Sequence, residues 1–264
     1  MDAHLPEHER DLRPKRLSGV VPLAWKVRAG RLLGMSMMAV RTSIGTIHIR
    51  PRDTDADVFE NIFVRRRPYD LGPFPQQARV VDAYRRILSS GDLPVIVDAG
   101  ANVGAASRWF ARAFPEAAIV AIEPDPGSAA VCRKNLIAVP RAQVIEAAIG
   151  STPGHVEVLP AAESLGTRTV RSSSGGVRIV TVDDALHSAG EKARPFIAKI
   201  DIEGFERDLF SANTGWIAKM PVVMVEPHDW RFPGERTSAP VLKAFAASGH
   251  ELLITGGDTL TFVL

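Results

Sequence analysis

The sequence predicts an α/β fold with a mostly parallel main sheet, and two observations carry this prediction. From Pro94 onward, short hydrophobic runs rich in β-branched residues alternate with helical patterns, which is typical of parallel strands joined by crossover helices. Near the end of the chain, two more runs flank Gly256, Gly257 and Asp258, a composition suited to a tight antiparallel hairpin. We therefore expect a seven-stranded sheet that ends in this hairpin.

The elements follow in chain order. Strands are expected at residues 95–98, 118–123, 143–147, 197–201, 222–226, 251–255 and 259–264, and helices at 105–113, 126–137, 203–213 and 239–248. Gly, Ser and Thr interrupt the alternation over residues 151–182, where two strand-like pieces, 155–159 and 177–182, predict an inserted hairpin near the mouth of the site. Residues 91–264 are thus expected to form one domain.

Residues 1–90 are expected to form a basic cap made of a helix, a strand pair at 40–44 and 46–50, and a helix at 77–88. The first fifty residues carry nine Lys and Arg against four acids, interleaved with apolar residues such as Trp25 and Leu32. Such a helix could lie on an anionic membrane or a lipid-linked substrate. We favour the alternative, a helix that packs on the core and leaves its basic face in water.

The composition, 45% hydrophobic and 23% charged, is that of a globular protein. The single cysteine, Cys132, leaves no partner for an internal disulfide and fits a reducing compartment. The charged opening does not resemble a secretory signal, and Lys26, Arg28 and Arg31 interrupt the apolar stretch 17–40. We expect a cytoplasmic protein without a transmembrane span.

An acid and two glycines follow the first strand of the core. Asp98 ends that strand, and Gly100, Asn102 and Gly104 occupy the turn into the next helix. The glycines allow a ligand to approach the backbone, and the helix start points free N–H groups at it. A dinucleotide site would have glycine where Asn102 stands, so a pyrophosphate fits poorly. We expect a ligand with an amino-acid tail, bound by Asp98 and by the groups around Asn102.

The next two strand ends complete the site of a nucleoside. Glu123, followed by Pro124 and Asp125, could accept hydrogen bonds from both ribose hydroxyls. Ala147 and Ala148 provide small apolar groups around an adenine. Each feature alone is common, but their order at successive strand ends predicts a cofactor site made of Asp98, Gly100, Asn102, Gly104, Glu123, Asp125, Ala147 and Ala148.

Acids and a histidine gather at the last two parallel strand ends. Asp201 and Glu203 follow one strand, and Glu226 and His228 follow the other. We expect these four to be catalytic, with Asp201 and His228 as candidate general bases. Asp201, Glu226 and His228 could also hold one divalent cation, although their spacing is not specific to a metal site. Glu203 and Glu206 equally suit the acidic first turn of a helix.

Together these residues resemble the FkbM family of methyltransferases. Its motifs stand here in order at residues 98–104, 123–125, 199–206 and 226–228, and residues 47–55 are similar to a segment that many members carry before the core. The resemblance implies a Rossmann-like class I methyltransferase fold and S-adenosylmethionine as cofactor. It also implies O-methylation of a hydroxyl on a sugar, a glycolipid or a natural product.

Two other functions fit parts of the pattern. A nicotinamide-dependent oxidoreductase would use the same sheet and Glu123, but Asn102 argues against it. A non-catalytic scaffold that binds an adenosine ligand would keep the cofactor residues and need neither Asp201 nor His228. Nucleic acid is not expected as a partner, because the sequence has no stripe of aromatic and basic residues. The acceptor and the oligomeric state have no readable sequence pattern.

Overall fold

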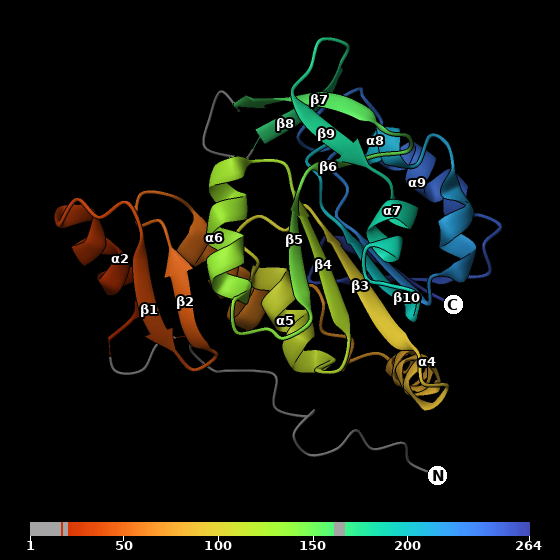
Figure 1. Ribbon diagram of the computed structural model, residues 1–264, viewed down its shortest axis with the longest axis horizontal. Coiled ribbons are helices and arrows are strands. Elements are labelled where there is room, and N and C mark those ends of the chain that lie inside the picture. The colour runs from red at the N-terminus through yellow and green to blue at the C-terminus, as the bar shows by residue number, and fades with distance from the viewer. Residues whose placement is uncertain (1–16, 18–20, 161–166) are drawn as a thin grey trace.

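The computed structural model describes residue 17 and residues 21–160 and 167–264. Its centre is a seven-stranded sheet in the order β12-β13-β11-β10-β3-β4-β5 (Figure 1). The strands are β3 (Leu93–Ala99), β4 (Ala118–Glu123), β5 (Ala142–Glu146), β10 (Ala193–Ile200), β11 (Val222–Val225), β12 (Glu251–Thr255) and β13 (Thr259–Val263). All neighbours are parallel except β13, which runs antiparallel to β11 and β12. This topology confirms the predicted class I methyltransferase arrangement.

Alternating side chains of the strands enter two separate cores. Val95 and Val97 of β3 pack toward α7 (Val182–His187), the 3₁₀ helix η2 (Thr214–Lys219) and α9 (Ser238–Phe245). Ile96 of β3 and Ile197 of β10 pack toward α4 (Gln77–Ser89), α5 (Ala105–Ala113) and α6 (Pro126–Leu136). Helices therefore cover both faces of the sheet, and its carboxyl-end edge is left for the site.

The helix predicted at residues 203–213 is wrong in extent. The structure has only a short helix α8 (Glu206–Leu209) there. Glu203 and Gly204 have φ values of 55° and 94°, and Asn213 has a φ of 54°. Left-handed residues cannot continue an α-helix, so these positions limit α8 on both sides. The acidic pattern of this segment therefore belongs mainly to a turn rather than to a helix.

The insertion contains more strands than we predicted. β7 (Gly154–Pro160), β8 (Thr167–Ser172) and β9 (Val177–Val180) join β6 (Ala148–Ile149) in a four-stranded sheet of order β6-β9-β7-β8. The prediction missed β8 because its sequence is almost entirely polar. The small sheet stands over the carboxyl ends of the main parallel strands (Figure 1).

The segment before β3 packs on the same core as α5. It consists of α2 (Leu23–Leu32), β1 (Met38–Thr42), β2 (Gly45–Ile49), α3 (Asp55–Glu60), the π-helix η1 (Asn61–Arg65) and α4. The side chain of Asn135 on α6 accepts a hydrogen bond from the backbone N–H of His48 and donates one to its carbonyl, which attaches β2 to the main domain. The expected charged tail, residues 1–16, lies outside the described residues. None of the helices in the described ranges is long and apolar enough to span a membrane.

Candidate active site

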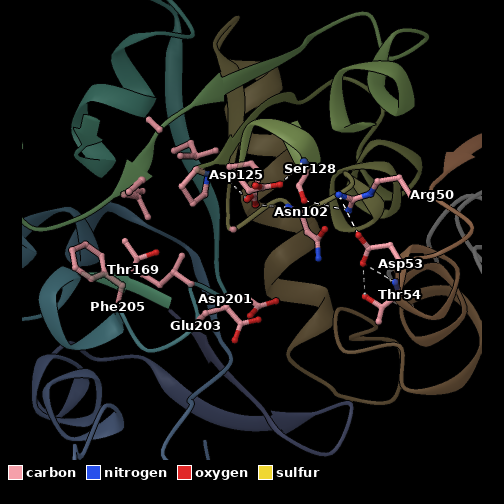
Figure 2. Close-up of a pocket in the computed structure, with 18 residues that line it drawn as sticks. Arg50, Asp53, Thr54, Asn102, Asp125, Ser128, Thr169, Asp201, Glu203 and Phe205 are labelled. Atoms are coloured by element: carbon pink, nitrogen blue, oxygen red, sulfur yellow. Dashed lines mark hydrogen bonds and ion pairs between the residues drawn. The ribbon is translucent and has the colours of Figure 1, made fainter. Parts of the chain in front are cut away.

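A cavity of about 360 Å³ opens at the carboxyl ends of β3, β4 and β10 (Figure 2). Its lining includes eight of the residues expected to be functional: Gly100, Asn102, Glu123, Asp125, Ala147, Ala148, Asp201 and Glu203. Strand ends that are far apart in sequence thus meet at one place, as expected for an open parallel sheet. The small sheet contributes Thr169 of β8 to the same lining.

The turn after β3 presses its backbone against the end of β10. Gly100 has a φ of 72°, and a Cβ at this position would lie 1.8 Å from the carbonyl oxygen of Asp201. Asn102 also adopts a left-handed conformation, with a φ of 49°. Glycine is therefore required at residue 100, because any side chain there would collide with the loop that carries Asp201.

Glu123 forms the floor of the cavity and is 6% exposed. Its Oε2 accepts a hydrogen bond from the backbone N–H of Asn102 at 2.8 Å, and its Oε1 accepts one from the N–H of Asp125 at 2.9 Å. Burial raises the pKa of Glu123 to about 7, against the effect of these hydrogen bonds. Each carboxylate oxygen retains a lone pair for a ligand, so Glu123 is both oriented and able to accept hydroxyl groups.

Asp98 and Gly104 do not line the cavity, so for these two residues the structure assigns a different place from the predicted ligand contact. Asp98 is fully buried, accepts a 2.6 Å hydrogen bond from Ser107, and pairs with Lys199 at 3.1 Å. Gly104 is the left-handed residue that starts α5, where a Cβ would meet Cys132. Asp98 and Gly104 thus stabilise the turn between β3 and α5 without lining the cavity.

The side of the cavity next to the small sheet is mainly apolar. Ala147, Ala148 and Ile149 line it, and Pro124 and Phe205 contribute further apolar surface. This surface suits a flat, uncharged ring system. Asp125 lies at its edge and caps α6 through a 2.7 Å hydrogen bond from the N–H of Ser128.

Asp201, Glu203 and His228 form an acid–base cluster. Nε2 of His228 lies 3.6 Å from Oδ1 of Asp201 and 3.5 Å from Oε2 of Glu203. Asp201 and Glu203 line the cavity, whereas His228 is 2% exposed and lies behind them. Burial and the charge of Asp201 raise the pKa of Glu203 to about 7, and Glu203 is also paired with Arg231. The two carboxylates therefore face the cavity, and the imidazole supports them.

Burial lowers the pKa of His228, but the hydrogen bond and charge of Glu206, together with the charges of Asp201 and Glu203, raise it to about 9. This imidazole is therefore mostly protonated at neutral pH and has no lone pair with which to accept a proton. Glu226 lies outside the cavity lining, and the charge of Asp201 together with burial raises its pKa to about 7. Asp201 and Glu203 thus line the cavity, whereas His228 and Glu226 lie behind or beside its lining.

One divalent cation could use this cluster. Asp201, Glu203 and His228 each offer a ligand atom, and these atoms lie within 4.8 Å of one another. The contact of Arg231 with the Glu203 carboxylate works against a metal, because a cation would have to displace or share that guanidinium. Protonated His228 already supplies positive charge to both acids. The donor set thus fits a metal only in part.

Comparison with known proteins defines the family. A family model described as the methyltransferase FkbM domain matches residues 98–251, which is more than half of the chain. The chain belongs to the FkbM methyltransferase family. The strand-end residues of the cavity, from Gly100 to Glu203, all fall inside the matched range.

Two methyltransferases of known name are similar to parts of the chain. The 2-O-methyltransferase NoeI of Sinorhizobium fredii is 39% identical over 67 residues, which cover 25% of this chain and 28% of NoeI. The hexuronic acid methyltransferase AglP of Haloferax volcanii is 27% identical over 137 residues, which cover 51% of this chain and 56% of AglP. The matches thus span less than two thirds of the length of either relative.

Among solved structures, the O-methyltransferase from Bacillus cereus in complex with SAH matches with a TM-score of 0.37 and 13% identity. That match covers 72% of this chain and 81% of the other.

Three lining residues lie before the part matched by the FkbM model and were not among the predicted site residues. Arg50, Asp53 and Thr54, from the loop between β2 and α3, form the wall beside Asn102 (Figure 2). The signal was present in the sequence, because residues 47–55 resemble a segment that many family members carry. Nothing in that segment reveals that the chain folds back over the strand ends, so the residues themselves could not be assigned.

Proposed function

We propose that this protein is an S-adenosylmethionine-dependent O-methyltransferase that methylates a hydroxyl group of a sugar, either free or within a glycan, glycolipid or natural product. One observation carries the proposal. A single cavity joins a buried carboxylate suited to ribose, Glu123, to two carboxylates suited to proton removal, Asp201 and Glu203. Membership in the FkbM family supports the same reaction class.

The cofactor has a natural orientation in this cavity. Glu123 accepts hydrogen bonds from the ribose hydroxyls, and the adenine lies against Ala147, Ala148 and Phe205. Asn102, Asp201 and Glu203 would then line the part of the cavity that receives the sulfonium end. The two carboxylates would stand where an acceptor hydroxyl approaches the methyl donor.

In the reaction, the acceptor oxygen attacks the methyl carbon and the carbon–sulfur bond breaks, which leaves S-adenosylhomocysteine. The hydroxyl proton passes to Asp201 or Glu203, which act as general base. Glu203, with a pKa of about 7, is well matched to proton transfer near neutral pH. His228 takes a different role from the predicted base: its protonated ring holds the two carboxylates in place.

A sugar acceptor is supported by the relatives. NoeI is named as a 2-O-methyltransferase and AglP as a methyltransferase of hexuronic acid. Thr169, Asp201 and Glu203 add polar groups to the lining, and such groups suit an acceptor rich in hydroxyls.

Calorimetric titration with S-adenosylhomocysteine tests the cofactor, with Glu123→Gln as the variant and Glu146→Gln as its control. Glu146 is paired in register with Glu123 on the adjacent strand but is exposed and outside the cavity. We expect micromolar binding that Glu123→Gln weakens by about tenfold or more and the control leaves unchanged. No binding to the folded wild type would refute the proposal, and tight NADH binding instead would favour an oxidoreductase.

An activity assay distinguishes an enzyme from a non-catalytic scaffold that binds an adenosine ligand. A screen of sugars with a labelled methyl donor should give S-adenosylhomocysteine and a methylated product with at least one acceptor. The double variant Asp201→Asn/Glu203→Gln should abolish turnover while it leaves S-adenosylhomocysteine binding within about twofold of wild type. A cell-based function that survives Asp201→Asn and His228→Asn would instead favour a non-catalytic scaffold.

We also propose that α2 contacts an anionic lipid surface, the context in which a lipid-linked acceptor would be presented. Trp25, Leu32 and Leu33 are 65%, 81% and 77% exposed, and Arg28 and Arg31 lie on the same short helix with exposed side chains. Exposed aromatic and aliphatic groups beside arginines bind the headgroup region of membranes. Co-sedimentation with vesicles containing phosphatidylglycerol should fall sharply in Trp25→Ser/Leu32→Ser; equal binding to purely zwitterionic vesicles, or no binding, would contradict the proposal.

A further inference from the structure

The cavity has a charged wall whose residues lie outside the part of the chain matched by the family model. Arg50, Asp53 and Thr54 form this wall, opposite the apolar side next to the small sheet (Figure 2). They come from the N-terminal segment, after β2, whereas the rest of the lining comes from the main domain and the small sheet. The wall thus places one cation and one anion beside the turn that carries Asn102.

Arg50 is held rigidly in this wall. Its Nε and Nη2 donate to the two carboxylate oxygens of Asp55 at 3.0 and 2.7 Å, and its own backbone N–H donates to Asp55 at 2.7 Å. Nη2 also lies 3.3 Å from the hydroxyl of Ser128 on α6. Asp55 is 1% exposed, so this anchor is buried. A guanidinium fixed in this way loses little entropy when it binds a further anion.

The other terminal nitrogen of Arg50 meets the second charge of the wall. Nη1 lies 3.3 Å from a carboxylate oxygen of Asp53, whose side chain is 44% exposed. Asp53 also accepts a 2.8 Å hydrogen bond from the N–H of Thr54 through its other oxygen. Arg50, whose side chain is 23% exposed, thus stands next to a more exposed carboxylate. Such a pair is complementary to a zwitterion, which carries an anion and a cation a few ångströms apart.

The amino-acid end of the proposed cofactor is such a zwitterion. With the ribose at Glu123 and the adenine against Ala147 and Ala148, the aminobutyrate chain has to leave the ribose toward Asn102. Arg50 and Asp53 are the charged groups of the wall on that side. We propose that Arg50 binds the α-carboxylate and Asp53 binds the α-ammonium of S-adenosylmethionine, so that the N-terminal segment completes the cofactor site.

This inference rests on the proposed function. A pair of ligands distinguishes a failure of the inference from a failure of the proposed function. S-Adenosylhomocysteine and 5′-methylthioadenosine share the adenosine and the thioether, but only the first has an amino-acid end. Both ligands are titrated calorimetrically into wild type, Arg50→Lys and Asp53→Asn. The matched control is Asp57→Asn, an exposed carboxylate on the adjoining α3 that pairs with Arg65 outside the cavity.

We expect each wall variant to bind S-adenosylhomocysteine at least about tenfold more weakly, because a charge-assisted hydrogen bond is lost. Binding of 5′-methylthioadenosine should stay within about twofold of wild type in all variants, and the control should change neither ligand. Asp53→Asn keeps the fold testable even where Arg50→Lys disturbs the buried Asp55.

Four results would overturn the inference. Equal weakening of both ligands would show that the wall is only structural. Unchanged S-adenosylhomocysteine binding with a raised KM for the acceptor would assign the wall to the acceptor. Wild type that binds neither ligand would refute the proposed function itself, and the inference with it; wild type that binds both, with variants unchanged, would refute the inference alone.

Discussion

Nδ1 of His228 lies 3.0 Å from Oε1 of Glu206, and the two side chains are 3% and 0% exposed. The same carboxylate oxygen accepts a hydrogen bond from the backbone N–H of Ile202, in the loop between Asp201 and Glu203. Glu206 therefore fixes both the histidine and the loop that carries the two cavity carboxylates. The opposite ring nitrogen of His228 is thereby directed at those carboxylates.

Glu206→Gln should lower the pKa of His228, because the hydrogen bond and charge of Glu206 are what raise it. The alkaline limb of the kcat/KM profile should then move to lower pH, while S-adenosylhomocysteine binding stays near wild type. Asp208→Asn is the matched control, because Asp208 lies on the same short helix but pairs with Arg171. An alkaline limb that does not move would show that Glu206 does not act through His228.

Activity should follow a bell-shaped pH profile. It should rise through pH 7 as Glu203, whose pKa is about 7, loses its proton, and fall through pH 9 as His228 loses the charge that holds the carboxylates. The raised pKa of His228 also stabilises the fold below about pH 6.5, and this contribution is lost as the pH rises through 9. A rate that instead increases through pH 9 would make neutral His228 the base.

The fold was readable from the sequence where the pattern is local. The strands at 118–123 and 251–255 and the helix at 105–113 coincide with β4, β12 and α5, because each combines a clear hydrophobic period with a defined turn. The polar strand β8 and the short α8 were not readable. β8 depends on pairing with β7, and the length of α8 depends on left-handed residues that no propensity reveals.

The site was readable where strand ends carry the functional groups. Glu123, Asp201 and Glu203 line the cavity, as their positions after parallel strands indicated. Asp98 looked equivalent, but its side chain points below the turn, where Lys199 lies beside it in register on β10. Arg50 could not be found at all, because its place depends on how the N-terminal segment packs over α6.

Gly100→Ala should destabilise the protein far more than Gly91→Ala, although the two glycines have similar φ values of 72° and 77°. A Cβ at residue 91 meets nothing within 4 Å, so Gly91→Ala should lose only the free energy needed to hold alanine in the left-handed conformation, about 1–2 kcal/mol. A Cβ at residue 100 also collides with the Asp201 carbonyl, and we expect a loss above about 4 kcal/mol. Urea unfolding of both variants measures the difference, and equal losses would contradict this close packing.

Removal of divalent metal should leave the activity unchanged. Arg231 and protonated His228 already balance the charge of Asp201 and Glu203, so a cation is not needed to hold the two acids together. Turnover after dialysis against EDTA is compared with turnover after magnesium, manganese or calcium is added back. Activity that disappears on chelation and returns with one metal would assign the cluster to that metal instead.

Lys199→Met should cost about 3–5 kcal/mol of folding free energy, because it leaves a buried carboxylate without its cation. Lys199 is 3% exposed, pairs with Asp98, and donates hydrogen bonds to the carbonyls of Ala99 and Gly100. Burial lowers the pKa of Lys199, but the charges of Asp98 and Asp201 raise it by a larger amount. The ammonium therefore stays protonated. Lys219→Met is the control, because that lysine is exposed. Since the Asp98–Lys199 pair holds the turn after β3, the double variant Asp98→Asn/Lys199→Met should recover part of the stability lost in Lys199→Met. If the double variant is as unstable as the two single losses added together, the pair is not the source of the effect.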